Sequence, residues 1–330
     1  MNKFSALISV FFLYAISNAQ HESAGTTYFA LLNNSVDARS IGMAGAATGI
    51  PNSLYCSFSN PAVLGADTSS LDVFLGYTSI FEGGFSGVPL AVSRSFGKYG
   101  VFGVNAFSAN TSVEGVDADN KKTGEDASYN YFNGGVSWGH HYGERIFCGA
   151  SLKGVYEKVA DYSHAAMLLD AGVQYRMNSD RLIYGFTIRN LGFVVKEFDY
   201  DESDGDLPLT FEAGLSFVPR PIPALRMAID VNKKIGDYVN FEPALEINVY
   251  KKYLALRLGY AFSQRDASYV WDKLQNEEND DYVKSNLSSL CVGAGLKTDI
   301  ANKKIAVDFG MQFRSVMITP EISLSAIIAL

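Results

Sequence analysis

The sequence predicts an all-β fold, a transmembrane antiparallel β-barrel of about 14 strands. Three observations lead to this prediction. From about Leu71 onward, apolar residues alternate with polar or small ones, and helical periodicity is almost absent. The three long polar connections all follow odd-numbered strands, which places them at the same end of the strands. The chain contains 30 Gly, 22 Phe and 19 Tyr but only 9 Pro, which suits many strands with tight turns and aromatic ends.

Composition and charge exclude several other classes of protein. Hydrophobic residues make up 48% of the 330 residues and charged residues 19%, which excludes a disordered or collagen-like chain. The formal net charge is −8, and Lys and Arg form no cluster. We therefore expect no nucleic-acid partner.

Residues 1–19 have the pattern of a secretory signal peptide. Lys3 precedes an apolar stretch over residues 4–16, and Ser17-Asn18-Ala19 places small residues where a signal peptidase reads them, so we expect cleavage before Gln20. A transmembrane anchor is the alternative, but the stretch is short and no stop-transfer flank follows. No later apolar run approaches the roughly 20 residues of a membrane-spanning helix. Membrane residence would therefore require strands.

Residues 20–69 form a predicted N-terminal segment, and residues 70–330 form the predicted barrel. The segment is rich in small residues over 38–47 and again near 57–64. Small residues permit close approach of two backbones, and Asn60-Pro61 indicates a turn or a helix start. We expect this segment to pack in or across one mouth of the barrel.

The strands follow one another to the end of the chain. Between residues 305 and 314, apolar Val307 and Phe309 alternate with Asp308, and residues 209–217 and 253–262 alternate in the same way. Such segments number about 14, each of about 9 to 15 residues, and an even number suits a barrel with both chain ends on one side. We expect strands to begin near Leu71, Val88, Val101, Ser128, Arg145, Tyr162, Arg181, Leu207, Ile222, Tyr238, Lys252, Asn286, Lys303 and Glu321.

Connection lengths provide an independent test. Residues 111–127, 193–206 and 266–284 form long polar connections after the third, seventh and eleventh strands. Connections of opposite parity are short. Outer-membrane barrels have short periplasmic turns and longer extracellular loops. We therefore expect the outer membrane of a diderm bacterium, with the long loops extracellular, both termini periplasmic, and the N-terminal segment in or across the periplasmic part of the barrel. The short connections are residues 98–99, 140–143, 178–179, 220–221, 251 and 301–302.

A soluble β-sandwich or lectin-like domain also alternates and is the alternative fold. The length of the strands and the scarcity of Pro stand against it. The final segment, residues 322–330, ends on the last residue of an apolar-alternating strand and resembles an outer-membrane assembly signal.

If the apolar faces meet lipid, the polar faces line the lumen. Charges inside a membrane persist only when they are paired or hydrated, and this lumen would contain six cations and six anions. Equal numbers of cations and anions favour ion pairs that brace the barrel over a lining of one charge that would select ions. A polar channel lining is the alternative. The predicted lumen charges are Lys153, Asp170, Arg189, Glu212, Arg226, Asp230, Glu242, Glu246, Arg257, Lys297, Asp308 and Arg314.

No pattern of catalysis or metal binding stands out. Cys56, Cys148 and Cys291 are widely spaced without a CxxC motif, which gives no support for a disulfide framework or a zinc ribbon. His140 and His141 fall in a predicted short turn, and we expect His164 to be a satisfied or solvated histidine rather than a base. No hydrolase, zinc-protease or phosphate-loop motif occurs. We expect no enzyme activity, no cofactor and no metal.

Two acidic runs, residues 199–206 and 277–281, carry enough carboxylates to bind calcium. They lack the spacing of an EF-hand. We favour solvated loops for both runs.

The N-terminal segment resembles the opening signature of the PorV/PorQ family, within the wider group of FadL-like outer-membrane barrels. That signature runs approximately A-R-x-x-G-M-G-G-A and then, after a gap, W-N-P-A-G-L. Ala44, Ser59 and Val63 depart from it, which makes this chain a divergent member. Downstream segments such as residues 169–175 and 188–192 look like family strands in family order. The matching residues are Ala38, Arg39, Gly42, Met43, Gly45, Ala46, Asn60, Pro61, Ala62 and Leu64.

The resemblance implies a 14-stranded barrel that assists type IX protein secretion or surface attachment by binding cargo or secretion-machinery proteins. The alternative is a FadL-like barrel that transports hydrophobic small molecules and can hold bound lipid. A transporter of this kind would need an apolar pocket behind the N-terminal segment and a gap in the barrel wall. The charged lumen argues against a greasy conduit. A surface lectin or adhesin is a third hypothesis.

Overall fold

The computed structural model describes residues 28–51, 54, 58–67, 69–80, 84–116, 122–160, 162–177, 180–196, 206–250, 253–267, 288–300, 303–314 and 319–330, without the side chains of residues 113–127. The predicted signal peptide, Cys56 and nearly all of the two acidic runs lie outside this part of the chain. Within it, no helix is both long and apolar enough to cross a membrane.

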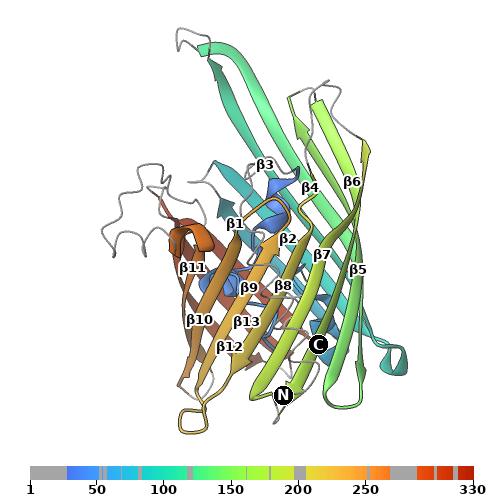
Figure 1. The fold of residues 1–330 in the computed structure, drawn as a ribbon, viewed down its shortest axis with the longest axis vertical. Coiled ribbons are helices and arrows are strands. Elements are labelled where there is room, and N and C mark those ends of the chain that lie inside the picture. Colours follow the sequence, from blue (N-terminus) through green and yellow to red (C-terminus); the bar gives the residue numbers. More distant parts are fainter. Residues whose placement is uncertain are drawn as a thin grey trace.

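The described strands close into one antiparallel barrel (Figure 1). Each strand pairs with the next along the chain, and β1 pairs with β14 to close the sheet, with Tyr77 opposite Leu324. Closure leaves no open sheet edge, so the wall can cross lipid with its backbone groups paired. The strands are β1 Leu71–Ile80, β2 Phe85–Ser95, β3 Val101–Val116, β4 Lys122–Tyr142, β5 Ile146–Val159, β6 Tyr162–Met177, β7 Leu182–Lys196, β8 Thr210–Phe217, β9 Leu225–Lys234, β10 Val239–Val249, β11 Leu254–Ser263, β12 Ser289–Ile300, β13 Lys303–Arg314 and β14 Glu321–Ala329.

This architecture confirms the predicted fold class, and burial explains why the alternation predicted it. Along β8, Thr210, Glu212 and Ser216 are buried, whereas Phe217 is exposed. The polar face of each strand thus looks into the filled lumen. The apolar face looks outward.

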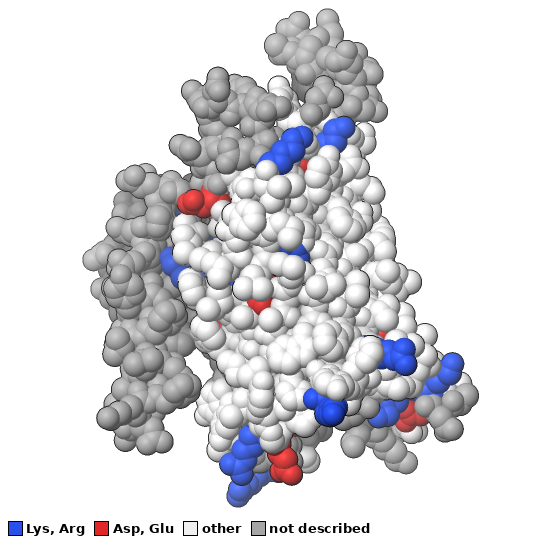
Figure 2. All heavy atoms as spheres, turned by 90° about the vertical axis from the view of Figure 1, so that its right-hand side faces the viewer, with Lys and Arg blue, Asp and Glu red and all other residues white. Residues whose placement is uncertain are grey.

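The outward face is an apolar surface. Leu75, Leu256 and Leu258 are 55%, 45% and 48% exposed, although all three lie within strands. Figure 2 shows mostly uncharged atoms over the middle of one face, with Lys and Arg gathered toward its upper and lower ends. So many exposed leucines on one surface are typical of strands that face the hydrocarbon core of a membrane. The charged ends of this surface are where the two interfaces of a bilayer would lie.

Two predicted connections are wrong because strand pairing continues through polar sequence. The sequence predicts a loop over residues 111–127, but β3 runs to Val116 and β4 begins at Lys122, with Glu114 opposite Asp126. This β3–β4 hairpin rises above the other strand ends in Figure 1. Likewise, His140 and His141 lie within β4 and not in a turn. Backbone ladder bonds do not require an apolar face, so polarity alone does not mark where these strands end.

The described part of the N-terminal segment, residues 28–51, 54 and 58–67, lies inside the barrel (Figure 1, blue). It contains η1 (Ala30–Asn33), α2 (Ala38–Gly42) and η3 (Pro61–Ala66); a fourth short helix, η4 (Gly97–Tyr99), lies in the turn before β3. Helix α2 packs against β11 to β14, and η3 packs against β3 to β6. Near the hairpin end, Phe29 joins a buried apolar cluster with Phe107 and Tyr131. The segment therefore packs in the barrel, as predicted, and continues toward the long-hairpin end.

Candidate functional site

The segment inside the barrel, here called the plug (residues 28–67), turns at α2. The side chain of Asp37 caps this helix by accepting a 2.8 Å hydrogen bond from the backbone N–H of Ser40. Burial raises the pKa of Asp37 above its usual value, although the bonds from Ser40 oppose that shift. After the helix, Ala44 and Gly45 adopt positive φ values of 55° and 97°. The chain thereby reverses toward the wall.

A buried ion network fastens α2 to the barrel. Arg39 reaches Glu246 on β10 through two bonds, Nε to Oε2 at 3.0 Å and Nη2 to Oε1 at 2.8 Å. Arg257 on β11 lies between Glu246, at 2.7 Å, and Asp308 on β13, also at 2.7 Å. Paired charges of this kind are tolerated in a low-dielectric interior, whereas a single one is not. The network therefore couples the plug to three strands.

A second polar contact fixes residues 47–48 of the plug. The backbone N–H groups of Ala47 and Thr48 donate to Oδ2 of Asp230, at 2.9 and 2.7 Å. The Thr48 hydroxyl donates to Glu212. Arg189 in turn donates to the other oxygen of Glu212, at 2.7 Å. Asp230 thus binds two backbone N–H groups of the plug, and Glu212 binds the side-chain hydroxyl of Thr48.

The Asn60-Pro61 signature forms a helix start, as its sequence indicates. Oδ1 of Asn60 accepts from the N–H of Ala62 at 3.0 Å, with Pro61 in the first turn of η3. Nδ2 of Asn60 donates to the carbonyl of Thr48 at 3.1 Å, and Gln174 on β6 donates to the same carbonyl at 2.8 Å. Asn60 therefore joins the two halves of the plug.

Inward-facing glycines let the plug backbone touch the wall. A Cβ on Gly185 would lie 2.0 Å from the carbonyl oxygen of Thr48, and one on Gly310 would lie 2.3 Å from that of Ala38. Because these neighbours are backbone atoms, no side-chain adjustment would relieve the overlap. The plug backbone thus passes the wall at strand positions that are occupied by glycine.

The wall itself is irregular at Asn190 on β7. Asn190 has a positive φ of 63°, and the β6–β7 register shifts between Leu169 and Ala171. Its side chain accepts from Nζ of Lys153 at 2.9 Å and donates to the carbonyl of Pro208 at 3.1 Å. Pairing between β7 and β8 ends at Arg189 opposite Thr210. The Asn190 side chain therefore connects the two strands beyond the point where their ladder stops.

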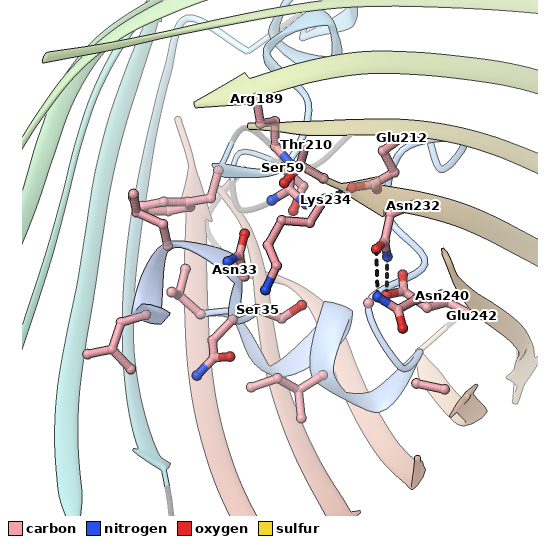
Figure 3. Close-up of a pocket in the computed structure, with 18 of the residues that line it drawn as sticks. Asn33, Ser35, Ser59, Arg189, Thr210, Glu212, Asn232, Lys234, Asn240 and Glu242 are labelled. Carbon is pink, nitrogen blue, oxygen red and sulfur yellow. Dashed lines mark hydrogen bonds and ion pairs between the residues drawn. The ribbon is translucent and has the colours of Figure 1, made fainter. Parts of the chain in front are cut away.

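A cavity of about 130 Å³ lies between the plug and the wall. Leu31 to Val36 of the plug form one side, and polar side chains from β3 to β10 form most of the other. In Figure 3, Asn33 and Ser35 of the plug face Lys234, Asn232 and Asn240 of the wall. The cavity is therefore not the apolar pocket that a transporter of hydrophobic molecules would need.

The predicted lumen charges all lie on the inward side of the barrel, and the signature residues lie in the plug. None of these twelve charged residues is fully exposed, and all ten signature residues except Gly45 are buried. Seven of the twelve pair with one another: Lys153 with Asp170, Arg189 with Glu212, and Arg257 with both Glu246 and Asp308. Partners outside the set are Arg39 for Glu246 and Glu321 for Arg314. Arg226 donates to Ser216 and to the carbonyl of Asp180. Glu242 accepts from Asn232.

Sequence reasoning missed Thr48, Gln174 and Asn190. Each is a neutral residue whose role comes from a partner more than 15 positions away. The only local signal is Asn190 itself, because Asn tolerates the left-handed conformation better than most residues. His164 is buried, and its Nε2 lies 2.8 Å from Oε2 of Glu157. No group of three or more potential metal ligands occurs among the described residues.

Comparison with known proteins shows a shared fold. No protein-family model matches the chain, and no curated protein matches it. The Pseudomonas putida toluene transporter TodX aligns with a TM-score of 0.60 at 12% identity, covering 88% of this chain and 96% of its own. The Ralstonia pickettii toluene transporter TbuX gives 0.56 at 11% identity, covering 90% and 98%. A Pseudomonas aeruginosa FadL homologue gives 0.50 at 11% identity, covering 89% and 97%.

These structural neighbours are FadL-family outer-membrane barrels. At such low identity the likeness establishes the architecture of the chain and nothing about what it binds. The neighbours are transporters and channels in name and not enzymes. The narrower resemblance to the PorV/PorQ family finds no support from a family model or from sequence matches.

Proposed function

We propose that this protein is an outer-membrane barrel that carries small molecules across the membrane through the space between the plug and the wall. The cavity supports this proposal most directly, because it lies behind the plug, where a transported molecule would have to pass. The fold adds support, since the neighbours TodX and CymD are described as a toluene transporter and a monoaromatic hydrocarbon channel.

Loop length supports one orientation of the barrel in the membrane, which is part of this proposal. We place the short turns, such as η4, in the periplasm and the β3–β4 hairpin outside the cell. The C-terminal strand β14 then ends on the periplasmic side, beside the start of β1. Cargo would enter from the hairpin end, where the plug begins at Tyr28.

Passage through the barrel requires the plug to move, because plug residues are packed against the wall and bonded to it at several points. Phe29, Ile50 and Leu64 each belong to a different buried apolar cluster that also contains residues of the barrel strands. The ion network at Arg39 and the carboxylate contacts at Thr48 hold the middle of the plug. The protein would therefore conduct through local rearrangement of the plug and not as an open pore.

Uptake into liposomes tests this proposal. Purified full-length barrel, reconstituted into liposomes, is expected to speed the entry of radiolabelled toluene, dodecanoate or a neutral sugar relative to protein-free liposomes. Heat-unfolded protein added to the same lipids is the control. If none of the three solutes enters faster, the transport function is wrong.

A second candidate function, binding of secretion-machinery or cargo proteins, is favoured by the protruding β3–β4 hairpin. The hairpin extends pairing to Val116 and Lys122, past the other strand ends (Figure 1). A hairpin that extends past the other strand ends is accessible to a partner protein. An affinity pull-down from solubilised outer membranes should recover type IX secretion components with the full hairpin but not with a hairpin shortened by a tight turn. Recovery of the barrel alone in both cases would reject this candidate.

A further inference from the structure

Ion pairs neutralise most of the charged side chains that line the cavity. Each cation has a carboxylate close by, so a bound ion would compete with partners that are already in place. The site therefore favours a neutral ligand over a charged one. The pairs are Lys153 with Asp170 at 2.6 Å, Arg189 with Glu212 at 2.7 Å, Lys234 with Asp237 at 2.6 Å and Arg314 with Glu321 at 3.0 Å.

The remaining hydrogen-bonding capacity belongs mainly to neutral amides. Among the described residues that line the cavity, five buried polar atoms have no partner. Native proteins satisfy such atoms with a side chain, water or ligand. Three of the five accept and two donate, which matches hydroxyl groups, because a hydroxyl does both. These atoms are Oδ1 of Asn105, Asn133 and Asn240, Nδ2 of Asn34 and Nε of Arg189.

One chain of amides shows how an acceptor is kept available. Nδ2 of Asn232 donates to Oε1 of Glu242 at 2.7 Å, and Nδ2 of Asn240 donates to Oδ1 of Asn232 at 3.1 Å (Figure 3). Because Oε1 of Glu242 accepts from Nδ2 of Asn232, the amide oxygen of Asn232 is turned toward Asn240 and accepts from its Nδ2. Oδ1 of Asn240, a residue only 9% exposed, is left as the unused acceptor at the end of the chain.

The size of the cavity and its mixed polar and apolar lining further limit which ligands fit. A volume of about 130 Å³ has room for roughly ten water molecules at ~10–15 Å³ each, which is comparable with the non-hydrogen atoms of a monosaccharide. Leu31, Val36 and Phe58 line another part of the cavity. Apolar surface beside several hydrogen-bonding groups suits a sugar ring, which has C–H faces and a hydroxyl rim.

We propose that this cavity binds a neutral, hydroxyl-rich molecule the size of a monosaccharide. This inference rests on the proposed transport function and names its cargo class. A hydrocarbon in the same place would leave the amide groups unpaired, and each such group weakens binding by about tenfold or more. The fold is thus shared with hydrocarbon transporters, while the cavity selects a different chemistry.

Saturation-transfer NMR on the full-length barrel in detergent tests the class directly. The probes are glucose, galactose, mannose, arabinose and N-acetylglucosamine, with toluene and dodecanoate for comparison. We expect saturation transfer to at least one sugar, and Asn240→Leu should weaken its binding roughly tenfold by removing one hydrogen-bonding group. Asn110→Leu, at an exposed position of β3, is the matched control and should bind like the unaltered protein. Heat-modifiable gel migration verifies that both variants fold.

The outcomes separate the cargo class from the transport function. If toluene or dodecanoate binds and no sugar does, the cargo class is wrong, while liposome uptake of those probes leaves the transport function intact. If a sugar binds but Asn240→Leu and Asn110→Leu behave alike, the ligand lies outside this cavity and the inference fails. If uptake fails for every solute, the transport function fails, whatever binds in detergent.

Discussion

The guanidinium of Arg39 donates hydrogen bonds to both carboxylate oxygens of Glu246, at 2.8 and 3.0 Å. Arg39 lies in a helix of only five residues, and Glu246 is 207 positions away in the sequence. Glu246 is shared with Arg257, which continues to Asp308. A short helix with little stability of its own is thus held by the barrel that it fills. This contact makes the position of the plug depend on the wall.

Arg39→Ala should loosen the plug without unfolding the barrel. The substitution removes two charge-assisted hydrogen bonds, worth about 2–3 kcal/mol, while Arg257 still neutralises Glu246. We expect faster proteolysis of residues 28–67 in the folded barrel and a larger solute leak through liposomes. Arg39→Lys keeps the charge but loses the paired geometry, so it should give an intermediate effect. Equal behaviour of Arg39→Ala and the unaltered protein would contradict a holding role.

Gly185→Ala should displace the plug through its backbone. The new methyl group would meet the Thr48 carbonyl oxygen at 2.0 Å, and overpacking of this kind costs about 1–3 kcal/mol. Gly154→Ala is the control, because its nearest neighbour would be Sδ of Met167 at 4.0 Å. Denaturant unfolding in detergent should show a loss for the first variant and none for the second. A plug that tolerates both equally would mean that the close approach is not required.

Ala44→Gly should stabilise the protein. Ala44 has a φ of 55°, a conformation that costs a non-glycine residue about 1–2 kcal/mol. Glycine loses about 0.5–1 kcal/mol in conformational entropy, so we expect a net gain of roughly 0.5–1 kcal/mol. Ala47→Gly, at a buried position without positive φ, should instead be destabilising. A loss of stability in both variants would refute the strain argument.

Leu258→Arg tests the outward face. Leu258 is 48% exposed in the middle of β11, and Arg at the midplane of a lipid-facing strand costs about 2–4 kcal/mol. Tyr253→Arg, just before β11, should cost about 0–1 kcal/mol because it lies near an interface. Reversible unfolding from lipid vesicles measures both. If the two substitutions cost the same, the apolar band does not meet hydrocarbon.

The proposed orientation predicts which insertions are accessible on intact cells. An epitope tag placed between β3 and β4 should bind antibody at the cell surface. The same tag at Gly143, in the short turn between β4 and β5, should bind only after permeabilisation. The reverse pattern would invert the barrel, and labelling at neither site would argue against the outer membrane.

The sequence by itself determined the wall. Alternation in segments such as residues 305–314 depends only on which side chains meet lipid and which meet the lumen, so the number of strands could be predicted from it. Most strands also begin close to their predicted starts, although β4 begins at Lys122 and not near Ser128. The inward charges were readable for the same reason. Strand ends were not, because β3 and β4 remain paired through polar residues up to Val116 and Lys122.

Tertiary structure alone decided what fills the lumen. The role of Gly185 depends on Thr48, and the role of Glu246 depends on Arg39, each from a distant part of the chain. No periodicity encodes such pairs, because the plug has no repeat and its path is set by where the wall carries glycine or a carboxylate. The polar cavity is likewise a property of two surfaces brought together: Asn240 is an ordinary strand residue until plug residues 31–36 enclose it.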